Sequence, residues 1–418
     1  MSILIKEVFL NKEIVDVYIE NGVFKKIGRS LNVEADQVIS GKDRAIIPSF
    51  FNVHTHAAMT LLRGYADDMD LHTWLNNHIW PFERKLTPDD VYIGTKLACL
   101  EMIKTGTTFF CDMYWHVEAI AQAVDEMGIR AAISSAYVDF EDPKKGEYFQ
   151  KKNREFFYSP PKVSSRVMFI MGPHAIYTVS KASLEWIRDF AQDMGLFVNI
   201  HVAETKKEME DCKKIRGTTP VKYLDDIGFL NERCILAHVI WVDEEEIEIL
   251  KNRNVKIAHV PTSNMKLASG SFKFDEFINQ RIIVGIGTDG CASNNNLDML
   301  EEMKIAALRA KMASNSPTSG KSDHIFMCAT KNGAMIFGID AGEIKEGKVA
   351  DCVLIDLNHP QMVPCHNLIS NLVYAANGDV VTTTICNGKI LMHDRYVEGE
   401  EEIIKTAKKQ IKSILDRL

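Results

Sequence analysis

The stretch Gln192-Asp-Met-Gly-Leu-Phe-Val-Asn-Ile-His-Val-Ala-Glu204 contains the unit that decides the fold: a helix end, a glycine and a buried strand. Gly195 can end the helix in the left-handed conformation without steric cost. The nearly continuous apolar run Phe197–Ala203 is typical of a parallel strand covered on both faces. Related units predict further strands at 107–112, 130–138, 234–239, 256–260 and 282–288.

Two more apolar runs, Ala45–Val53 and Val167–Gly172, bring the expected strands to eight. Helices alternate with them, and the clearest helix start is Thr87-Pro-Asp-Asp90, with Thr as N-cap, Pro at the first position and acids in the first turn. Eight such units over about 250 residues predict a closed (β/α)8 TIM barrel. A doubly wound open sheet is the rival, but the glycine-rich dinucleotide motif after the first strand is missing.

The two ends of the chain have a different pattern. Residues 1–44 and 345–396 alternate apolar and polar residues, as short antiparallel strands do. We therefore expect residues 1–48 and 345–396 to form one composite β-sandwich domain flanking a barrel of residues 49–344. Residues 397–418 are expected to form a charged amphipathic C-terminal helix.

Composition narrows the class of protein. The net charge is −8 without a basic block, which argues against nucleic acid as a partner. The longest apolar runs are strand-length, so no membrane span is expected, and the first residues do not have the pattern of a signal peptide. Nine scattered cysteines without a C-x-x-C pair favour a reducing, cytoplasmic location. A small-molecule substrate is the expected partner.

Five metal-capable residues fall at the ends of predicted strands. His54 and His56 follow the first strand, His201 ends the fifth, His238 ends the sixth and Asp289 follows the eighth. Catalytic residues of a barrel lie at the C-terminal ends of its strands, so these five should converge. Imidazole and carboxylate groups suit Zn²⁺ or a similar first-row ion. Unrelated polar histidines are the alternative, and an H-x-H pair alone is a weak signal.

A bound divalent ion would make water acidic enough for hydrolysis at neutral pH. Glu204, three residues beyond His201, is placed to carry a proton to a ring nitrogen or leaving amine. Asp289 could ligate through one oxygen and take the water's proton with the other. His238 could either ligate the ion or hydrogen-bond the attacking water. The alternative for Glu204 is a solvated loop acid.

Several motifs resemble those of one family. They are Asn52-Val-His-Thr-His56, Met59-Thr-Leu-Leu-Arg-Gly-Tyr-Ala-Asp-Asp68, Gly172-Pro-His174, His201-Val-Ala-Glu204 and Gly287-Thr-Asp-Gly-Cys-Ala-Ser-Asn-Asn295. Together they resemble the amidohydrolase superfamily, and within it the methylthioadenosine/S-adenosylhomocysteine deaminase branch, which also contains triazine chlorohydrolase-like enzymes. The resemblance covers nearly the whole chain and implies a barrel with a flanking β-sandwich.

The resemblance also implies roles for individual residues. The metal ligands would be His54, His56, His201 and Asp289, with His238 beside the attacking water and Glu204 as proton shuttle. The substrate contacts would be Glu83 to the ribose hydroxyls, His174 to the purine, and Ser293 in the pocket. Without the resemblance, Glu83 would be taken for an exposed charge. Trp74, Trp80 and Phe82 could either stack on a base or pack a loop.

The resemblance implies one ion per chain. We expect Zn²⁺, with Fe, Ni or Mn as alternatives, and no second ion, because the fourth strand ends in Ile170-Met-Gly-Pro-His174 without a bridging lysine. A homo-oligomer is the family expectation. His259 ends the seventh strand and is expected to lie behind the ligands rather than among them.

One position departs from the family pattern. Members that take S-adenosylhomocysteine hold its carboxylate with arginines after the third strand, but here the strand reads Ser134-Ser135-Ala136. The lysine-rich stretch at residues 144–154 could substitute, although a solvated loop is its ordinary role. Methylthioadenosine, 5′-deoxyadenosine or adenosine are therefore the expected substrates of a deaminase. Two alternatives stay open: a deaminase or dehalogenase of another ring (guanine, pterin, triazine), and a metal-dependent sensor without catalysis.

Overall fold

The computed structural model describes residues 2–418. Its central feature is a ring of parallel strands: β6 (Phe50–Thr55), β7 (Thr107–Tyr114), β8 (Arg130–Tyr137), β9 (Val167–Phe169), β10 (Gly172–Pro173), β11 (Val198–Val202), β12 (Cys234–His238), β13 (Lys256–His259) and β14 (Ile283–Ile286). The strands form two hydrogen-bonded groups, β6 to β10 and β11 to β14. Bridges from Met171 to Val198 and from Ala175 to His201 join the groups on one side.

The ring closes where β14 meets β6. The amide of Asp289 donates to the carbonyl of His54 at 3.0 Å. Gly287 makes this approach possible, since a Cβ atom there would lie 2.7 Å from the backbone N and O of His54. β9 and β10 together take the place of the expected fourth strand, so the predicted (β/α)8 barrel is confirmed.

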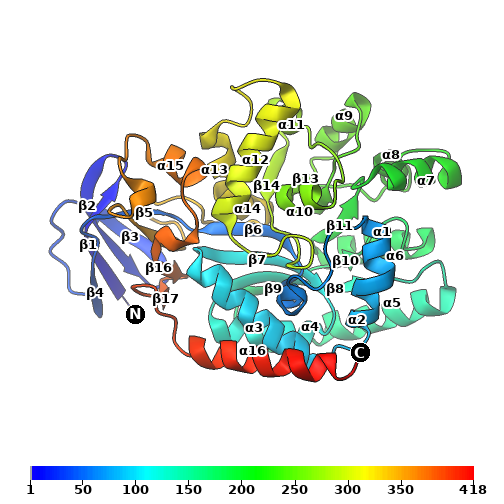
Figure 1. The fold of residues 1–418 in the computed structure, drawn as a ribbon, viewed down its shortest axis with the longest axis horizontal. Coiled ribbons are helices and arrows are strands. Elements are labelled where there is room, and N and C mark those ends of the chain that lie inside the picture. The colour runs from blue at the N-terminus through cyan, green and yellow to red at the C-terminus, as the bar shows by residue number, and fades with distance from the viewer. Residues whose placement is uncertain (1) are drawn as a thin grey trace.

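Helices cover the outside of the barrel (Figure 1). They are α3 (Pro88–Lys104), α4 (Val117–Met127), α5 (Pro143–Tyr158), α6 (Lys181–Met194), α7 (Lys206–Arg216), α8 (Pro220–Asp226), α9 (Glu244–Asn252), α10 (Pro261–Lys266), α11 (Phe274–Asn279), α12 (Met299–Ser314), α13 (Ser322–Ala329) and α14 (Lys331–Ile336). The predicted start of α3 is confirmed, because Thr87 and Asp90 form a reciprocal capping box.

One predicted strand was wrong in its extent. The run Ala45–Val53 is divided between β5 (Arg44–Pro48) and β6, and only β6 belongs to the barrel. β5 pairs antiparallel with β15 (Cys352–Asp356) in a separate sheet. The chain passes from one sheet to the other at Ser49, directly after Pro48. This Pro-Ser pair marks a break in the run, but it does not show that the strands on either side join different sheets, because both strands are buried.

The separate sheet contains strands from both ends of the chain (Figure 1). Its order is β17 (Lys389–Met392), β16 (Val381–Cys386), β15, β5, β1 (Ser2–Leu10), β2 (Glu13–Glu20) and β3 (Val23–Gly28), with β4 (Gln37–Ser40) also paired to β1. It encloses its own apolar cluster, including Ile3, Val17, Phe24, Ile46 and Leu354.

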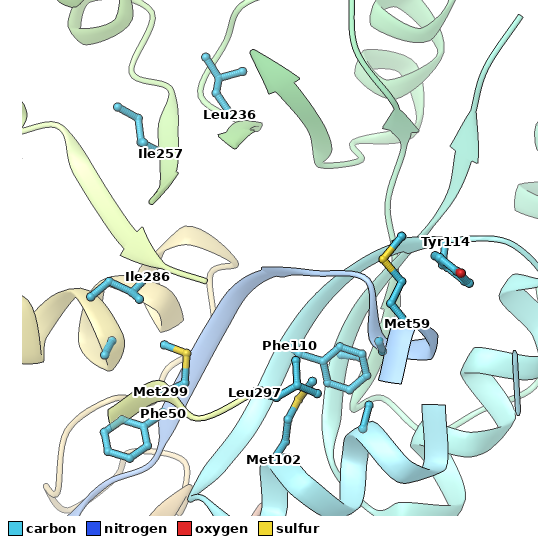
Figure 2. Packing of buried hydrophobic residues seen from close by; sticks show 14 of the residues in the cluster. Phe50, Met59, Met102, Phe110, Tyr114, Leu236, Ile257, Ile286, Leu297 and Met299 are labelled. Carbon is cyan, nitrogen blue, oxygen red and sulfur yellow. The ribbon is translucent and has the colours of Figure 1, made fainter. Parts of the chain in front are cut away.

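The core beside this sheet is built from barrel strands and α3. Figure 2 shows Phe50 of β6, Phe110 of β7 and Met102 of α3 among the residues that fill it. All three side chains are fully buried. This packing fixes the N-terminal halves of the strands, and their C-terminal ends are left to carry polar side chains.

The C-terminal helix α16 (Glu400–Leu415) lies along α3 (Figure 1). Gln410 and Arg417 donate to the buried carboxylate of Asp90 at 2.7 and 2.6 Å. A smaller helix, α15 (Leu368–Tyr374), packs against α12 and α13. Among residues 2–418, no helix combines the length and apolar character needed to cross a bilayer.

Candidate metal centre and adjoining pocket

The five metal-capable residues lie together at the C-terminal mouth of the barrel. Oδ1 of Asp289 is 3.2 Å from Nε2 of His56 and 3.7 Å from Nε2 of His54. The ligand atoms of His54, His201 and His238 lie within 4.8 Å of one another, as do those of His54, His56 and Asp289. The predicted convergence of side chains from four strands is therefore present, with His238 as near to the cluster as the expected ligands.

Hydrogen bonds at Nδ1 aim three of the imidazoles. The acceptors at Nδ1 are Met113 O for His56 (2.7 Å), His174 O for His201 (2.7 Å) and Asn264 Oδ1 for His238 (2.8 Å). Because a carbonyl can only accept, Nδ1 carries the hydrogen, so Nε2 is the nitrogen that offers a lone pair to the cluster when each ring is neutral. This is the tautomer that a metal ligand requires.

Asp289 is held by donors on both oxygens. The hydroxyls of Ser263 and Ser293 lie 2.6 and 3.1 Å from Oδ2, and the Gly290 amide donates to Oδ1 at 2.8 Å. Oδ1 is thus the oxygen that faces the histidines. Burial alone would raise the pKa of Asp289, but the hydrogen bond and charge of His56 hold it well below its usual range. Ser293, expected in the pocket, contacts Asp289 directly.

The cluster fits a divalent metal ion. Among the described residues, Nε2 of fully buried His54 has no hydrogen-bond partner, an unusual cost unless another group binds there. Burial and the neighbouring His56 lower the pKa of His54, so this imidazole is neutral. Burial lowers the pKa of His56, but Asp289 more than offsets this and raises it to about 9. An ion would displace that proton on binding.

Glu204 is buried in the same mouth, so the solvated-loop alternative is wrong. Its Oε2 lies 3.7 Å from Nε2 of His238, and Ser269 donates to Oε1 at 3.4 Å. Burial raises the pKa of Glu204, and His238 partly opposes this effect. A buried carboxyl with a raised pKa beside a cluster of metal-capable residues is suited to hold and release a proton.

Glu208 supports this segment and was missed in the sequence. Ala203 has a left-handed backbone (φ 52°), and the Glu208 carboxylate accepts from the amides of Ala203 and Glu204 at 2.9 and 2.8 Å. Thr205 and Glu208 have the spacing of a capping box, a signal that could have pointed to it. Glu208 therefore fixes the direction of the Glu204 side chain.

Replacing Glu208 by glutamine should lower kcat about 10–100-fold, as loss of a supporting group does, because an amide can accept with one oxygen only. Burial raises the pKa of Glu208 to about 7, although the hydrogen bonds from the amides of Ala203 and Glu204 lower it in part. Below that pH the neutral acid accepts more weakly, so activity should fall as pH drops through about 7. A kcat–pH profile tests this: the acid limb should be absent from Glu208→Gln. Exposed Glu210→Gln is the matched control, and equal profiles for all three proteins would contradict the assignment.

A pocket of about 70 Å³ lies above the cluster and is lined by the predicted substrate contacts Glu83, His174 and Trp74 as well as Glu204. Trp74, on α1 (Leu71–Trp74), donates its indole N–H to Ala66, so it presents an apolar wall. Burial lowers the pKa of His174 to about 3, and its ring is therefore neutral.

Glu83 ends α2 (Trp80–Glu83) and borders the pocket. Trp115 Nε1 donates to Oε2 of Glu83 at 3.3 Å, and burial raises the pKa of this carboxyl. The reading of Glu83 as an exposed charge is wrong, since it borders the pocket. Of the neighbouring aromatics, Phe82 is fully buried and packs on Tyr65, whereas Trp80 borders the pocket.

Other supporting residues also escaped the sequence analysis. Buried Asp112, at the end of β7, accepts from the amide of Ala57 at 2.7 Å and so fixes the turn after His56. The Asn199 amide lies 3.4 Å from Nδ1 of His54. His259 stacks on Phe272 with ring centroids 4.0 Å apart and belongs to neither group of metal-capable residues in the described part of the chain. Asp112 and Asn199 lie on strands already predicted, but periodicity cannot separate their roles from ordinary packing.

Comparison with known proteins identifies the scaffold. The model of the amidohydrolase family matches residues 45–391. The chain belongs to the amidohydrolase family. The predicted resemblance is thereby confirmed, and the match spans every strand of the barrel and all five residues of the metal cluster.

Relatives within the family include a 5-methylthioadenosine/S-adenosylhomocysteine deaminase of Thermococcus sibiricus, 47% identical over 94% of both chains. A 5′-deoxyadenosine deaminase of Methanospirillum hungatei is 46% identical over 96% of this chain and 90% of its own. Among solved structures, an adenosine deaminase from Xanthomonas campestris with bound zinc has a TM-score of 0.93 at 32% identity, covering 99% of this chain and 98% of that one. These names agree with the predicted class of activity.

Proposed function

We propose that this amidohydrolase is a metal-dependent deaminase that converts adenine nucleosides into the inosine analogues and ammonia. The observation that carries the proposal is the buried Glu204 carboxyl, which faces the histidine–aspartate cluster in the same pocket that Glu83 borders. The deaminase relatives, which match more than nine-tenths of the chain, support the same reaction.

His54, His56, His201 and Asp289 would hold one divalent ion, for which we propose Zn²⁺. The donor set of imidazoles and one carboxylate suits that ion, although Fe, Ni or Mn accept the same donors. When bound there, such an ion would make water acidic enough to attack at neutral pH. His238, whose Nε2 also faces the cluster, is placed to orient that water by a hydrogen bond.

The proton transfers fall to the chain's own carboxyls. Deamination adds water to the ring carbon that bears the amine, adds a proton to the adjacent ring nitrogen and expels ammonia. Glu204 would donate the proton to the ring nitrogen and recover one from the attacking water. Two serine hydroxyls engage Oδ2 of Asp289, so Oδ1, which faces the histidines and also accepts from the Gly290 amide, is the oxygen that would ligate the ion.

Glu83 tests whether the substrate carries a ribose. One carboxylate can accept from two hydroxyls, and hydrogen bonds to a charged group contribute about 1.5–3 kcal/mol each. Glu83→Gln should therefore raise the KM for adenosine about tenfold or more, with a smaller change in kcat. Steady-state kinetics check this against exposed Glu147→Gln as control. An unchanged KM would exclude ribose recognition by Glu83.

The reaction itself is tested by ammonia release from the Zn-loaded protein. The panel is adenosine, 5′-deoxyadenosine, methylthioadenosine and S-adenosylhomocysteine, with guanine and a triazine alongside. We expect turnover of the neutral adenine nucleosides above the homocysteine compound, since Ser135 stands where an arginine would bind the carboxylate. Activity on guanine or triazine alone would keep the hydrolase and overturn the substrate.

A further inference from the structure

A second cavity of about 870 Å³ adjoins the pocket above the metal cluster. Four residues border both spaces: Trp80, Glu83, Trp115 and Val138. The proposed ribose-binding carboxylate therefore stands where the two cavities meet. Pockets that enclose a small ligand measure about 300–1,000 Å³, a range that includes the second cavity and not the first. The reacting ring fits the small pocket only if the rest of the substrate extends into the large one.

The walls of the large cavity are mainly apolar. Helix α5 contributes Phe149, Phe156 and Phe157, and the opposite wall includes Ile133 of β8 and Ile170. The three rings are only half-buried although they lie on the inner side of a helix that covers the barrel. Apolar side chains left accessible in a concavity are typical of a ligand site.

The cations at this cavity lie at its rim. Arg84, Lys145 and Lys152 are all exposed, and the two lysines rest on the rings of Phe140 and Tyr148 at 5.5 and 5.9 Å from the centroids. On β8, the inner wall presents the uncharged side chain of Ser135. A charged substituent drawn inside would lose its hydration without gaining a buried partner, whereas an apolar one gains contact.

We propose that the large cavity binds a bulky apolar substituent on the 5′ carbon of the nucleoside, so that 5′-alkylthio- or 5′-arylthioadenosines with groups larger than methyl are preferred substrates. This inference rests on the proposed deamination and on the placement of the ribose at Glu83. It extends the substrate class beyond the small and the charged 5′ groups named for the relatives. The substituent takes no part in the reaction; it contributes binding energy only.

The test compares kcat/KM for adenosine, methylthioadenosine, 5′-hexylthioadenosine and S-adenosylhomocysteine on the zinc-loaded full chain. Burying one methylene is worth up to about fourfold in affinity, so we expect the KM for the hexylthio compound to be at least about tenfold below that for methylthioadenosine. Titration calorimetry should likewise show that 5′-hexylthioinosine binds more tightly than methylthioinosine, in a measurement without turnover. Deamination of adenosine combined with a higher KM for the hexylthio compound would overturn this inference alone; no deamination of any nucleoside would overturn the proposed function with it.

Ser135→Phe adds a ring to the inner wall and should lower the ratio of kcat/KM for hexylthioadenosine to that for adenosine at least tenfold. Lys151→Phe, which adds the same ring to the exposed face of α5, should leave the ratio unchanged; the Lys151 side chain is 76% exposed. The double variant Lys145→Ala, Lys152→Ala tests whether the cavity binds a charged 5′ group instead. A selective loss of S-adenosylhomocysteine turnover in this variant would show that the cavity binds a carboxylate and would overturn the proposal. A ratio insensitive to Ser135→Phe would also contradict the proposal.

Discussion

Replacing Glu204 by glutamine should lower kcat for adenosine by about 10²–10⁴-fold, the usual contribution of a positioned general acid or base. The amide keeps the size of the side chain and its contact with Ser269, but it cannot carry a proton between the water and the ring. KM should change little, because the contacts proposed to bind the ribose and the 5′ group are untouched. Single-turnover rates of ammonia release would measure the effect without interference from product release.

The variant Glu208→Gln distinguishes the loss of the proton-carrying carboxyl from a change in the position of Glu204. It leaves the Glu204 carboxyl in place and loosens only its backbone, so its decrease should be smaller than that of Glu204→Gln. Metal content should stay at the wild-type level in both variants. If Glu204→Gln retained most of the activity, the proton would have to travel by another group, and the mechanism proposed for this pocket would be wrong.

Removal of the ion is expected to abolish activity and to lower thermal stability. The metal cluster places the pair His56–Asp289 and three further imidazoles in a buried space, and an ion that binds only the folded state at 1,000 times its Kd stabilises by about 4 kcal/mol. Dialysis against a chelator followed by calorimetric melting should therefore show a lower Tm, and zinc should restore both activity and Tm.

The variant Asp289→Asn should weaken metal binding without a chelator. It removes the charge that faces His54 and His56, so metal analysis should give far less than one ion per chain. His324→Ala, at an exposed histidine of α13, is the control for nonspecific binding and should keep the full content. Two ions per wild-type chain would contradict the single site.

The parts of the site predicted from the sequence share a physical reason. His54, His201 and Asp289 are recognisable because each comes at the end of a buried apolar run, and parallel strands of a barrel end at a common mouth. Glu83 had no such marker. It lies on a two-helix segment between strands, and only the path of that segment brings it beside Trp115.

The residues that hydrogen-bond to the metal-capable side chains could not be predicted from the sequence, for a related reason. Ser263 and Asn264 lie on α10, far along the chain from Asp289 and His238, the residues that they contact. Small polar side chains occur in every loop, so their types carry no indication of a partner until the loops are placed. The left-handed backbones of Ala203, His238 and Asp289 are likewise consequences of the assembled mouth.

The sequence by itself determined the barrel, the participation of both termini in a second sheet, and the set of metal-capable residues, because buried runs, glycine-ended helices and strand ends are local patterns. Only the tertiary structure decided where Ala45–Val53 divides between two sheets, which oxygen of Asp289 faces the histidines, and that a large apolar cavity opens beside Glu83. These features depend on distances between segments remote in the chain, and packing alone sets those distances.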